Sequence, residues 1–403
     1  MSKPVVALVG ALDTKGAEYA FLRARIESTG AGALYIDTGI FGPAEGLVPE
    51  VPAAEVALAG GCALDELSAK NDRGYAMDVM CRGVEHIVHK LYAEGKIHGI
   101  IAMGGGGGTT VGTAAMRALP VGVPKVMVST LASGDVSNYV QESDILMMPS
   151  IVDIAGINRF SAMILSNAAV AVSGMVLQEK LEIAEDKPLL AATMFGVTTP
   201  CVTHAKEVLE KAGYEVLVFH AVGSGGKTME NLIRGGYIQG VLDITTTEWC
   251  DELVGGILSA GPNRLEAAGQ AGIPQIVSAG ALDMVNFGPM DSIPAKFEGR
   301  NLVPHNPLNT LMRTTVEENI ELAKIIASKL NKATGKTIFL MPLKGVSMLD
   351  AEGGPFYDPA ADKAFLDTLK ENLSDNVELI LVDAHINDPV FAEKAAELLM
   401  QNL

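Results

Sequence analysis

A run of five glycines directly after a run of apolar residues is the feature that most limits how this chain folds. Ile100–Met103 is apolar, Gly104–Gly108 follows, and Thr109 opens a segment with helical character. This order predicts a buried strand, a tight loop and the start of a helix. Glycine has no Cβ, so its backbone N–H groups can approach an anion, and the start of a helix adds partial positive charge. A nucleotide phosphate fits such a loop; a tight structural turn is the alternative.

The glycine run matches neither of the two common nucleotide-binding fingerprints. No Gly-Lys-Ser/Thr follows it, so it is not a P-loop, and no register of the run satisfies G-x-G-x-x-G. The loop therefore predicts a phosphate-sized anion without naming the ligand.

Length and composition predict an α/β protein with two domains. The chain has 403 residues, which is too many for one ordinary core. It is 48% apolar with 43 glycines and few aromatic residues, as expected for buried parallel strands that end in glycine turns. A charged, proline-containing run at 182–188 separates a domain at 1–185 from one at 186–403. We expect two Rossmann-like, doubly wound parallel-sheet domains with a cleft between them.

Charge and cysteine content indicate the cellular setting. The net charge is −18 and the Lys and Arg residues are scattered, so neither nucleic acid nor an anionic membrane is expected as a partner. The four cysteines form no C-x-x-C pair and the N-terminus lacks a signal-peptide pattern, which predicts a cytoplasmic location. Phe160–Leu177 carries no charge, but its serines and asparagine favour a buried helix over a membrane span.

Polar or glycine-rich clusters follow the predicted strands of the N-terminal half, at 5–9, 33–37, 124–130 and 145–148. The carboxyl ends of parallel strands share one edge of the sheet, where ligands bind. At the end of the second strand, either Asp37 or Thr38 is expected near a nucleotide, unless Asp37 only caps a helix or loop. Residues 42–75 are predicted to form a long excursion, in which Arg73 is the candidate to reach a phosphate.

The same pattern returns in the C-terminal half. A predicted strand at 215–221 contains His220 and leads into a second glycine loop, Val222–Lys227, which repeats the geometry of an anion site. Imidazole and carboxylate groups at converging strand ends suit general acid–base chemistry or a metal site, but no local metal spacing such as H-E-x-x-H occurs, so no metal ligand is assigned. The alternative is that these groups only hydrogen-bond at the edge of the core. The predicted catalytic residues are His220, Asp243, Glu248 and His305, with His385, Glu230 and Asp283 as further members of the cluster and Lys227, Arg313 and Lys344 as possible partners of an anionic substrate.

Several longer motifs are specific enough to indicate a family. They are Asp13–Lys15, Gly104–Thr109, Val128–Gly134, Pro149–Asp153, Thr193–Pro200, Gly240–Glu248 and Gly280–Gly288. On these motifs the chain resembles, over nearly its whole length, the amino-terminal ATP-binding region of the tomato mosaic virus resistance protein and its uncharacterised bacterial and fungal relatives. The resemblance implies two Rossmann-like subdomains, with ATP held chiefly by the first. The nucleotide contacts that it implies are Lys15, Thr38, Arg73, Gly104, Gly105, Gly106, Gly107, Thr109, Ser133, Gly134 and Asp153.

This sequence departs from the family pattern at two places. The loop is all glycine where relatives can carry a serine, and Asp135 follows Ser133 and Gly134 where an uncharged residue can stand. A carboxylate beside a triphosphate repels it unless Mg²⁺ intervenes, so either a metal is present or Asp135 points away.

Together these features predict a cytoplasmic, homodimeric or larger protein that binds ATP, with or without Mg²⁺. The leading hypothesis is an enzyme that acts on a small anionic metabolite in the cleft. The alternatives are a nucleotide-gated binding or regulatory protein without turnover, and a metal-dependent hydrolase or lyase of a keto acid. The sequence names neither the reaction nor the metabolite.

Overall fold

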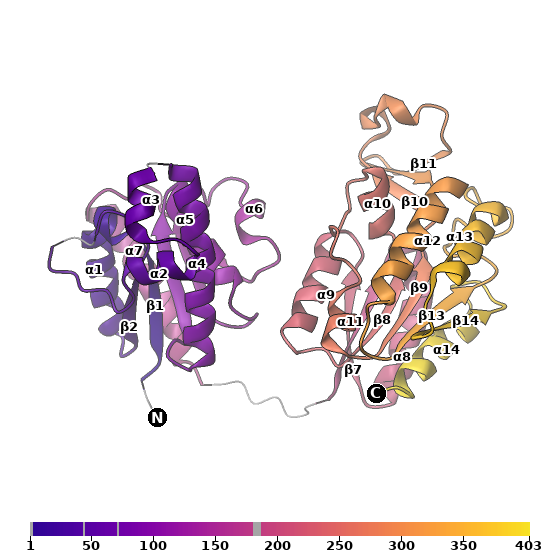
Figure 1. Cartoon of the computed structure of the whole chain (residues 1–403), viewed down its shortest axis with the longest axis horizontal. Helices are drawn as coiled ribbons and strands as arrows, with labels where there is room; N and C mark the ends of the chain where they lie inside the picture. Colours follow the sequence, from indigo (N-terminus) through magenta and orange to yellow (C-terminus); the bar gives the residue numbers. More distant parts are fainter. Residues whose placement is uncertain (1–2, 43–44, 71, 180–186) are drawn as a thin grey trace. The chain divides into compact units, whose positions relative to one another are not determined.

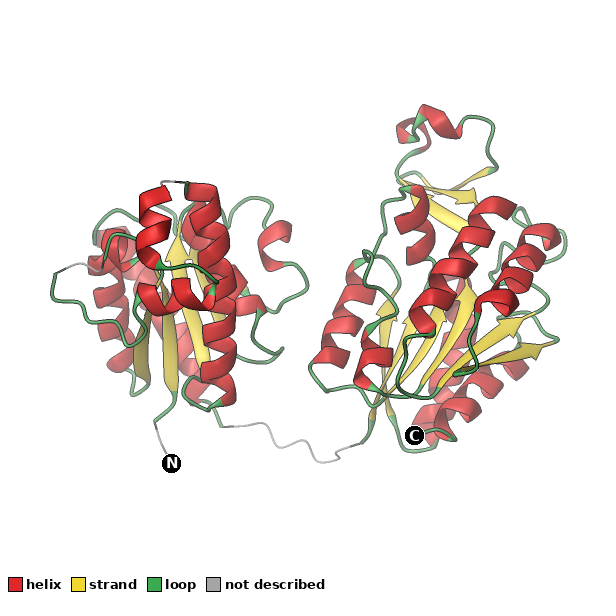
Figure 2. Cartoon of the chain, in the orientation of Figure 1, coloured by secondary structure: helices red, strands yellow, loops and turns green. Residues whose placement is uncertain are grey.

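The chain forms two compact units, Met1–Glu182 and Ile183–Leu403, in a computed structural model that describes residues 3–42, 45–70, 72–179 and 187–403. Each unit carries helices on both faces of a parallel sheet (Figures 1 and 2). The predicted α/β class with doubly wound parallel sheets is confirmed. The predicted boundary between residues 185 and 186 lies outside the described residues.

The first unit is built on a five-stranded sheet of order β2-β1-β3-β4-β5, and every neighbouring pair is parallel. This is a doubly wound order, in which the chain moves from β1 to β2 and then returns to the other side of β1 for β3. The carboxyl ends of β1 and β3 therefore flank the point where the strand order reverses. The elements are β1 (Val5–Gly10), α1 (Leu12–Glu27), β2 (Gly32–Asp37), α2 (Ala53–Ala59), α3 (Leu64–Lys70), α4 (Arg73–Ala93), β3 (Gly99–Gly104), α5 (Gly106–Arg117), β4 (Lys125–Ser129), α6 (Ser137–Val140), β5 (Leu146–Pro149) and α7 (Arg159–Leu177).

Tyr19 of α1 fixes the reversal point of this sheet. Its hydroxyl donates to the carbonyl of Val9 and accepts the N–H of Met103 at 3.1 Å, so one side chain ties β1 to β3. Gly10 has to be glycine, because a Cβ there would lie 2.0 Å from the Tyr19 hydroxyl oxygen. The two strand ends are thus held at a fixed separation, as a binding site requires.

The second unit repeats this topology with one further strand. Its sheet has the order β14-β13-β9-β8-β6-β7 and is parallel throughout. Its elements are β6 (Leu189–Met194), η1 (Gly196–Thr198), α8 (Thr199–Lys211), β7 (Glu215–His220), α9 (Ser224–Arg234), β8 (Gly240–Thr245), α10 (Glu248–Val254), α11 (Ala267–Ala271), β9 (Gln275–Gly280), β10 (Met284–Phe287), η2 (Met290–Ser292), η3 (Ala295–Phe297), β11 (Leu302–Asn306), β12 (Asn309–Arg313), α12 (Val316–Leu330), β13 (Thr337–Pro342), α13 (Pro359–Asn372), β14 (Val377–Val382) and α14 (Pro389–Met400).

Three local features differ from the prediction. The excursion at 42–75 contains two short helices, α2 and α3, rather than loop alone. Gly106, Gly107 and Gly108 form the first turn of α5, with Gly105 as its N-cap, so the glycine run is mostly the start of a helix. The insert between β9 and β13 forms a three-stranded antiparallel sheet, β10-β12-β11, which the sequence did not predict because such short strands carry little periodic signal.

Helix α7, which carries no charged residue after Arg159 at its start, is only partly buried. Within the described ranges it is the one helix whose length and composition would allow it to cross a membrane. One face packs on α1 and on strands β1, β3 and β4, as in an ordinary α/β unit. The opposite face is exposed, so the predicted buried helix is buried on one side.

Candidate functional site

A cavity of about 380 Å³ opens in the first unit where the strand order reverses. Its walls come from the turn after β1, the residue after β2, the glycine run after β3 and the loop after β5. This is the position at which doubly wound folds bind ligands. Most of the predicted nucleotide contacts line it, namely Lys15, Thr38, Arg73, Gly104, Gly105, Gly106, Gly107 and Asp153.

The other three predicted contacts are not part of this wall. Thr109 is buried, and its hydroxyl bonds the carbonyl of Gly105 at 2.8 Å and the Ser129 hydroxyl at 2.7 Å, so it supports the glycine turn from below. Ser133 and Gly134 are exposed in the turn after β4. Neither lines the cavity.

The glycines of the run fall into two groups according to what a side chain would meet. A Cβ at Gly104 would lie 2.7 Å from the Cα of Gly108, and one at Gly108 would lie 2.9 Å from the Met103 carbonyl. Those two glycines are required by backbone packing. A Cβ at Gly106 would meet nothing within 4 Å, and at Gly105 and Gly107 the nearest atoms are 3.6 and 3.5 Å away. Packing within the protein therefore does not explain Gly105, Gly106 and Gly107, all of which line the cavity.

The first turn of α5 presents backbone donors to the cavity. Its N-cap, Gly105, has no side chain, and the first helical bond runs from the N–H of Thr109 to the Gly105 carbonyl at 2.8 Å. Among the described residues no acceptor bonds the N–H groups of Gly106, Gly107 or Gly108. Unpaired amides at a helix start favour an anion.

Two cations add to this positive potential. Lys15 lies at a kink in α1, and its Nζ donates to the carbonyl of Ile154. A guanidinium nitrogen of Arg73 lies 3.5 Å from the Cβ position of Gly107. Neither side chain forms an ion pair with a residue that the structure describes. Asp153 is the one acidic residue in the wall, and its carboxylate accepts the N–H of Ile154 at 2.8 Å.

A second cavity, of about 420 Å³, adjoins the first and shares Ala11, Thr14, Thr38, Arg73, Met77 and Val111 with it. Its wall is largely apolar, and Phe41, which is 80% exposed, lies on it. An aromatic side chain beside flexible methionines suits a flat, apolar ring. None of the other residues of this wall was predicted as a nucleotide contact; they are Asp13, Gly39, Ile40, Leu67, Asp72, Ala76 and Met80.

Two open questions from the sequence are answered by geometry. Asp37 is fully buried and accepts the N–H groups of Leu12 at 3.0 Å and Gly39 at 2.9 Å, so it ties two loops together beneath the cavity while Thr38 faces it. Burial raises the pKa of Asp37. Asp135 is exposed, accepts the N–H of Ser137 at 2.9 Å and is absent from the cavity wall, so it points away.

In the second glycine loop, the anion position is occupied by a carboxylate of the protein, that of Glu248. The Glu248 carboxylate accepts the N–H of Gly223 at 2.7 Å and of Gly226 at 3.2 Å. A Cβ at Gly226 would lie 2.3 Å from that carboxylate. The loop that the sequence predicted as a second anion site is thus filled by a side chain.

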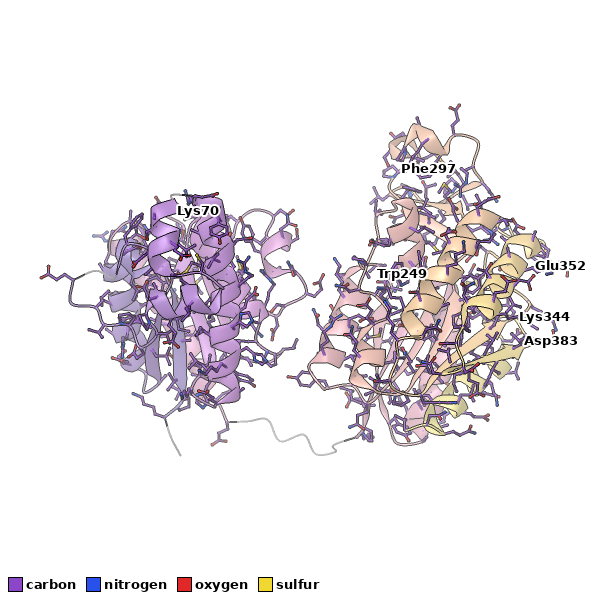
Figure 3. All side chains as sticks on the ribbon, in the orientation of Figure 1. Lys70, Trp249, Phe297, Lys344, Glu352 and Asp383 are labelled. Carbon is purple, nitrogen blue, oxygen red and sulfur yellow. The ribbon has the colours of Figure 1, made fainter. Side chains whose placement is uncertain are left out.

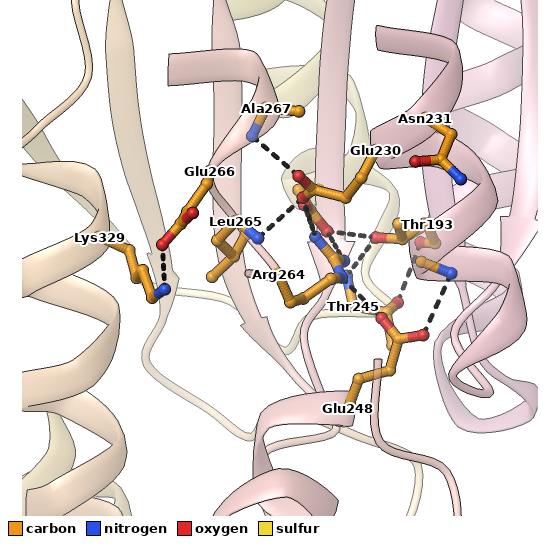
Figure 4. Close-up of polar contacts among 12 residues, drawn as sticks. Thr193, Glu230, Asn231, Thr245, Glu248, Arg264, Leu265, Glu266, Ala267 and Lys329 are labelled. Atoms are coloured by element: carbon orange, nitrogen blue, oxygen red, sulfur yellow. Dashed lines mark hydrogen bonds and ion pairs between the residues drawn. The ribbon is translucent and has the colours of Figure 1, made fainter. Parts of the chain in front are cut away.

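Arg264 organises the buried acids around this loop (Figure 4). Its guanidinium is 1% exposed and bonds both oxygens of Asp243, at 2.5 and 2.6 Å, and the carboxylate of Glu248 at 2.6 Å. Glu230 lies 3.5 Å away and also accepts the N–H groups of Leu265 and Ala267, at 2.8 Å each. The sequence did not indicate Arg264, because a single arginine in an irregular segment carries no motif.

The predicted catalytic residues are therefore brought together only in part. Asp243 and Glu248 share Arg264, whereas His220 is exposed and packs its ring on Phe195 with centroids 5.4 Å apart. His305 is exposed on β11 of the small antiparallel sheet. No hydrogen bond or ion pair of the described residues joins either histidine to the two acids, and the catalytic role of all four stays a prediction.

A third cavity, of about 500 Å³, lies at the carboxyl end of β13 and is lined in part by Lys344, Glu352, Asp362 and Lys363. Lys344 pairs with Asp383 at 3.1 Å on the surface (Figure 3). Burial and the neighbouring Asp350 raise the pKa of Asp362 to about 7, against the opposing charge of Arg313. Among the described residues, no three His, Cys, Asp or Glu side chains are grouped as a metal site would need.

Sequence comparison places both units in one family. Residues 4–181 match the N-terminal domain, and residues 187–403 the C-terminal domain, of the Uncharacterised protein family (UPF0261). The chain belongs to this family. A UPF0261 protein of Clostridium tetani is 56% identical over 99% of both chains, and one of Rhizobium meliloti is 48% identical over 97% of both.

A plant relative matches over part of its length. The ToMV resistance protein Tm-1(GCR237) of Solanum lycopersicum is 46% identical over 82% of this chain and 45% of its own. Among solved structures, UDP-N-acetylglucosamine 2-epimerase from Rickettsia bellii is 10% identical, with 68% of this chain and 79% of that chain covered and a TM-score of 0.24. A score this low carries no inference about function.

Proposed function

We propose that the first unit of this UPF0261 protein binds a nucleotide, ATP being the first candidate, with the phosphates at Gly105–Gly107 and the base in the adjoining apolar cavity. The main observation behind this proposal is the open space at the Cβ positions of Gly105, Gly106 and Gly107. They have no packing partner that forbids a side chain, so the space they leave open suits a ligand that approaches the backbone closely.

Charge supports a phosphate in this space. The cavity wall carries the unpaired N–H groups of Gly106, Gly107 and Gly108 together with the cationic side chains of Lys15 and Arg73. Asp153 supplies the one carboxylate of this wall. In the second unit the equivalent turn is neutralised internally by Glu248. The first unit offers no such carboxylate among its described residues, so an external anion completes the same arrangement.

Mg²⁺ fits this proposal only as a companion of the phosphates. It prefers oxygen ligands, usually one or two carboxylates together with phosphate and water. Asp153 supplies one carboxylate at the wall, and no other acid lines the phosphate cavity. Protein ligands alone are too few to hold the ion, so its binding would depend on the nucleotide.

The acids of the second unit do not enter this proposal. Asp243 and Glu248 already use their oxygens on Arg264 and on backbone N–H groups, which leaves little capacity for a substrate. Two alternatives remain for the role of the nucleotide: an enzyme that turns over a small anionic metabolite, and a nucleotide-gated binding protein. Consumption of ATP in the presence of the metabolite distinguishes the enzyme from the binding protein.

The test is the Gly106→Val variant. Its side chain enters open space in the free protein, so the fold is retained, but it occupies the phosphate position. A nucleotide present at 100 times its dissociation constant stabilises the wild type by about 2.7 kcal/mol, and the variant should lose that gain. Calorimetric titration and thermal unfolding with ATP, ADP, GTP and pyrophosphate measure both effects.

Gly196→Val is the matched control, because a Cβ at Gly196 also meets nothing within 4 Å but lies in the second unit. It should retain the full response. Equal ATP stabilisation of Gly106→Val and the wild type, or no nucleotide response in the wild type, would refute the proposal.

A further inference from the structure

The turn after β5 holds an isoleucine in a backbone conformation that isoleucine rarely adopts. Ile151 has a φ of 65°, in the left-handed region that a β-branched side chain strongly disfavours. The N–H of Val152 donates to the carbonyl of Ser150 at 2.7 Å, so Ile151 is the central residue of a strained γ-turn. Most other described residues with a positive φ are glycines; the exceptions are Gln141, Leu265 and Ala281.

Side-chain packing does not account for this isoleucine. Its side chain is 71% exposed and lines neither of the two cavities of the nucleotide site. Glycine would form the same turn without strain. Strain that persists in a folded protein has to be held by the surrounding contacts, and it is often found at binding sites and switch regions.

The strained turn directly precedes two groups of the nucleotide site. Asp153 supplies the carboxylate of the phosphate cavity, and the carbonyl of Ile154 accepts a hydrogen bond from the ammonium group of Lys15. Further along, the N–H of Gly156 donates to the carboxylate of the buried Glu18 at 2.6 Å. Lys15 and Glu18 both belong to α1, so this helix holds the segment at two points.

A ligand can reach one of these two restraints. Lys15 lines the phosphate cavity, and within the described parts of the chain its ammonium group donates only to the Ile154 carbonyl. A phosphate oxygen is charged and bonds an ammonium group more strongly than a neutral carbonyl does. Neither Glu18 nor Gly156 lines that cavity. A bound phosphate therefore competes for the first restraint and leaves the second in place.

We propose that Ser150–Gly156 is a loop that responds to the nucleotide: it is strained while the site is empty and relaxes when a phosphate takes Lys15 from the Ile154 carbonyl. This inference rests on the nucleotide site proposed above. Relaxation releases the strain at Ile151, so the release contributes to nucleotide affinity. The loop leads into α7 through the cap residue Asn158, and most of its residues are exposed, so occupancy of the site changes the surface of the first unit.

The first experiment measures ATP affinity by calorimetric titration in variants that change the strain but not the cavity wall. Ile151→Gly removes the strain from the free protein, so the ATP dissociation constant should rise about fivefold or more. Ile151→Ala removes the exposed side chain but retains the Cβ, and its affinity should stay within about twofold of wild type. Gln141→Gly is the matched control, because Gln141 is a left-handed residue of the same unit, with a φ of 47°, and lines neither cavity. Its ATP affinity should equal that of wild type.

Thermal unfolding without ligand separates loss of strain from a loosened loop. Loss of strain at least offsets the greater freedom of glycine in the unfolded chain, so the Tm of Ile151→Gly should not fall below that of wild type. A loop that is merely loosened by glycine would lower both the Tm and the ATP affinity.

The second experiment follows hydrogen exchange of the amides of residues 152–156 by mass spectrometry. In the wild type, saturating ATP should accelerate this exchange, whereas an ordinary ligand contact slows it. In Lys15→Ala without nucleotide, the exchange should already be about tenfold faster than in wild type, because one restraint is absent.

Four results would each overturn the loop proposal alone. They are ATP binding that slows or does not change the exchange of 152–156, wild-type exchange in ligand-free Lys15→Ala, equal ATP affinities for wild type and Ile151→Gly, and a lowered Tm of Ile151→Gly. A wild type that gives a flat calorimetric titration with ATP overturns the nucleotide site itself and the coupling with it.

Discussion

Replacing Arg264 by leucine should destabilise the second unit severely. The guanidinium is buried and is the only cation within 4.0 Å of Asp243 and Glu248 among the described residues. Removing one partner of a buried ion pair typically costs about 3–5 kcal/mol, because a charge is left without compensation. A whole domain is stable by only about 5–15 kcal/mol. The variant should therefore lose a large share of the stability of this unit.

The loss should depend on pH in a defined direction. Burial raises the pKa of Glu248 even with Arg264 opposing it. Without the arginine, the folded-state pKa of Glu248 rises further above its unfolded value of about 4. An acid with a raised folded-state pKa is protonated below that pKa, where its burial lowers the free energy of unfolding only slightly. As the pH rises through the folded-state pKa, the buried group must either stay protonated or ionise without a partner, and the free energy of unfolding falls. The difference in unfolding free energy between wild type and Arg264→Leu should be larger at pH 8 than at pH 5.

Tryptophan fluorescence during urea unfolding measures this difference, because Trp249 is the single tryptophan and is buried in the second unit. Arg234→Leu is the control: Arg234 also contacts Glu230, at 3.4 Å, but its side chain is 43% exposed. Such a surface pair contributes at most about 1 kcal/mol. Equal losses for the two variants would show that the buried acids do not depend on Arg264.

Three further outcomes are expected. Lys15→Ala should weaken ATP binding about tenfold or more in calorimetry, since a charged contact to phosphate contributes roughly 1.5–3 kcal/mol; an affinity within twofold of wild type would make Lys15 a structural residue. Burial raises the pKa values of Asp251 and Asp362 to about 7, so their stabilising contribution is complete below about pH 4 and is lost as the pH rises through about 7; Trp249 fluorescence should show a smaller pH dependence in Asp362→Asn. His220→Asn should change unfolding free energy by no more than about 0.5 kcal/mol, because the side chain is exposed.

The sheets could be predicted from the sequence because each strand is a short apolar run that ends at glycine or at polar residues. The strand predicted at 33–37 became Gly32–Asp37, and the strand predicted at 215–221 became Glu215–His220. A β-α-β order then restricts the topology, since parallel strands need right-handed crossovers. The small antiparallel sheet had no such signal, because its strands β10 and β12 are short and are separated in the chain by residues 288–308.

Side-chain partners were harder to predict, because they depend on contacts far apart in the chain. Asp243 and Glu248 were predicted as members of one cluster, but the residue that joins them, Arg264, comes from a segment without a motif. Asp37 and Thr38 are adjacent in the sequence, but their side chains differ in role. Asp37 is buried and supports two loops, whereas Thr38 lines the cavity. Sequence pattern assigns residues to a region of the fold, and packing assigns their partners.

The two glycine loops show why the same pattern can serve two purposes. Both loops follow a parallel strand and begin a helix, and an anion site was predicted at each of them. In the second unit, Glu248 accepts the N–H groups of Gly223 and Gly226, and a Cβ at either glycine would collide with neighbouring atoms at 2.7 and 2.3 Å. In the first unit, Gly106 is open and its N–H has no acceptor among the described residues. Backbone donors at a helix start need an acceptor of some kind. The second unit supplies its own carboxylate, so its glycines are explained by structure. For Gly105, Gly106 and Gly107 of the first unit, the explanation that we propose is a bound nucleotide.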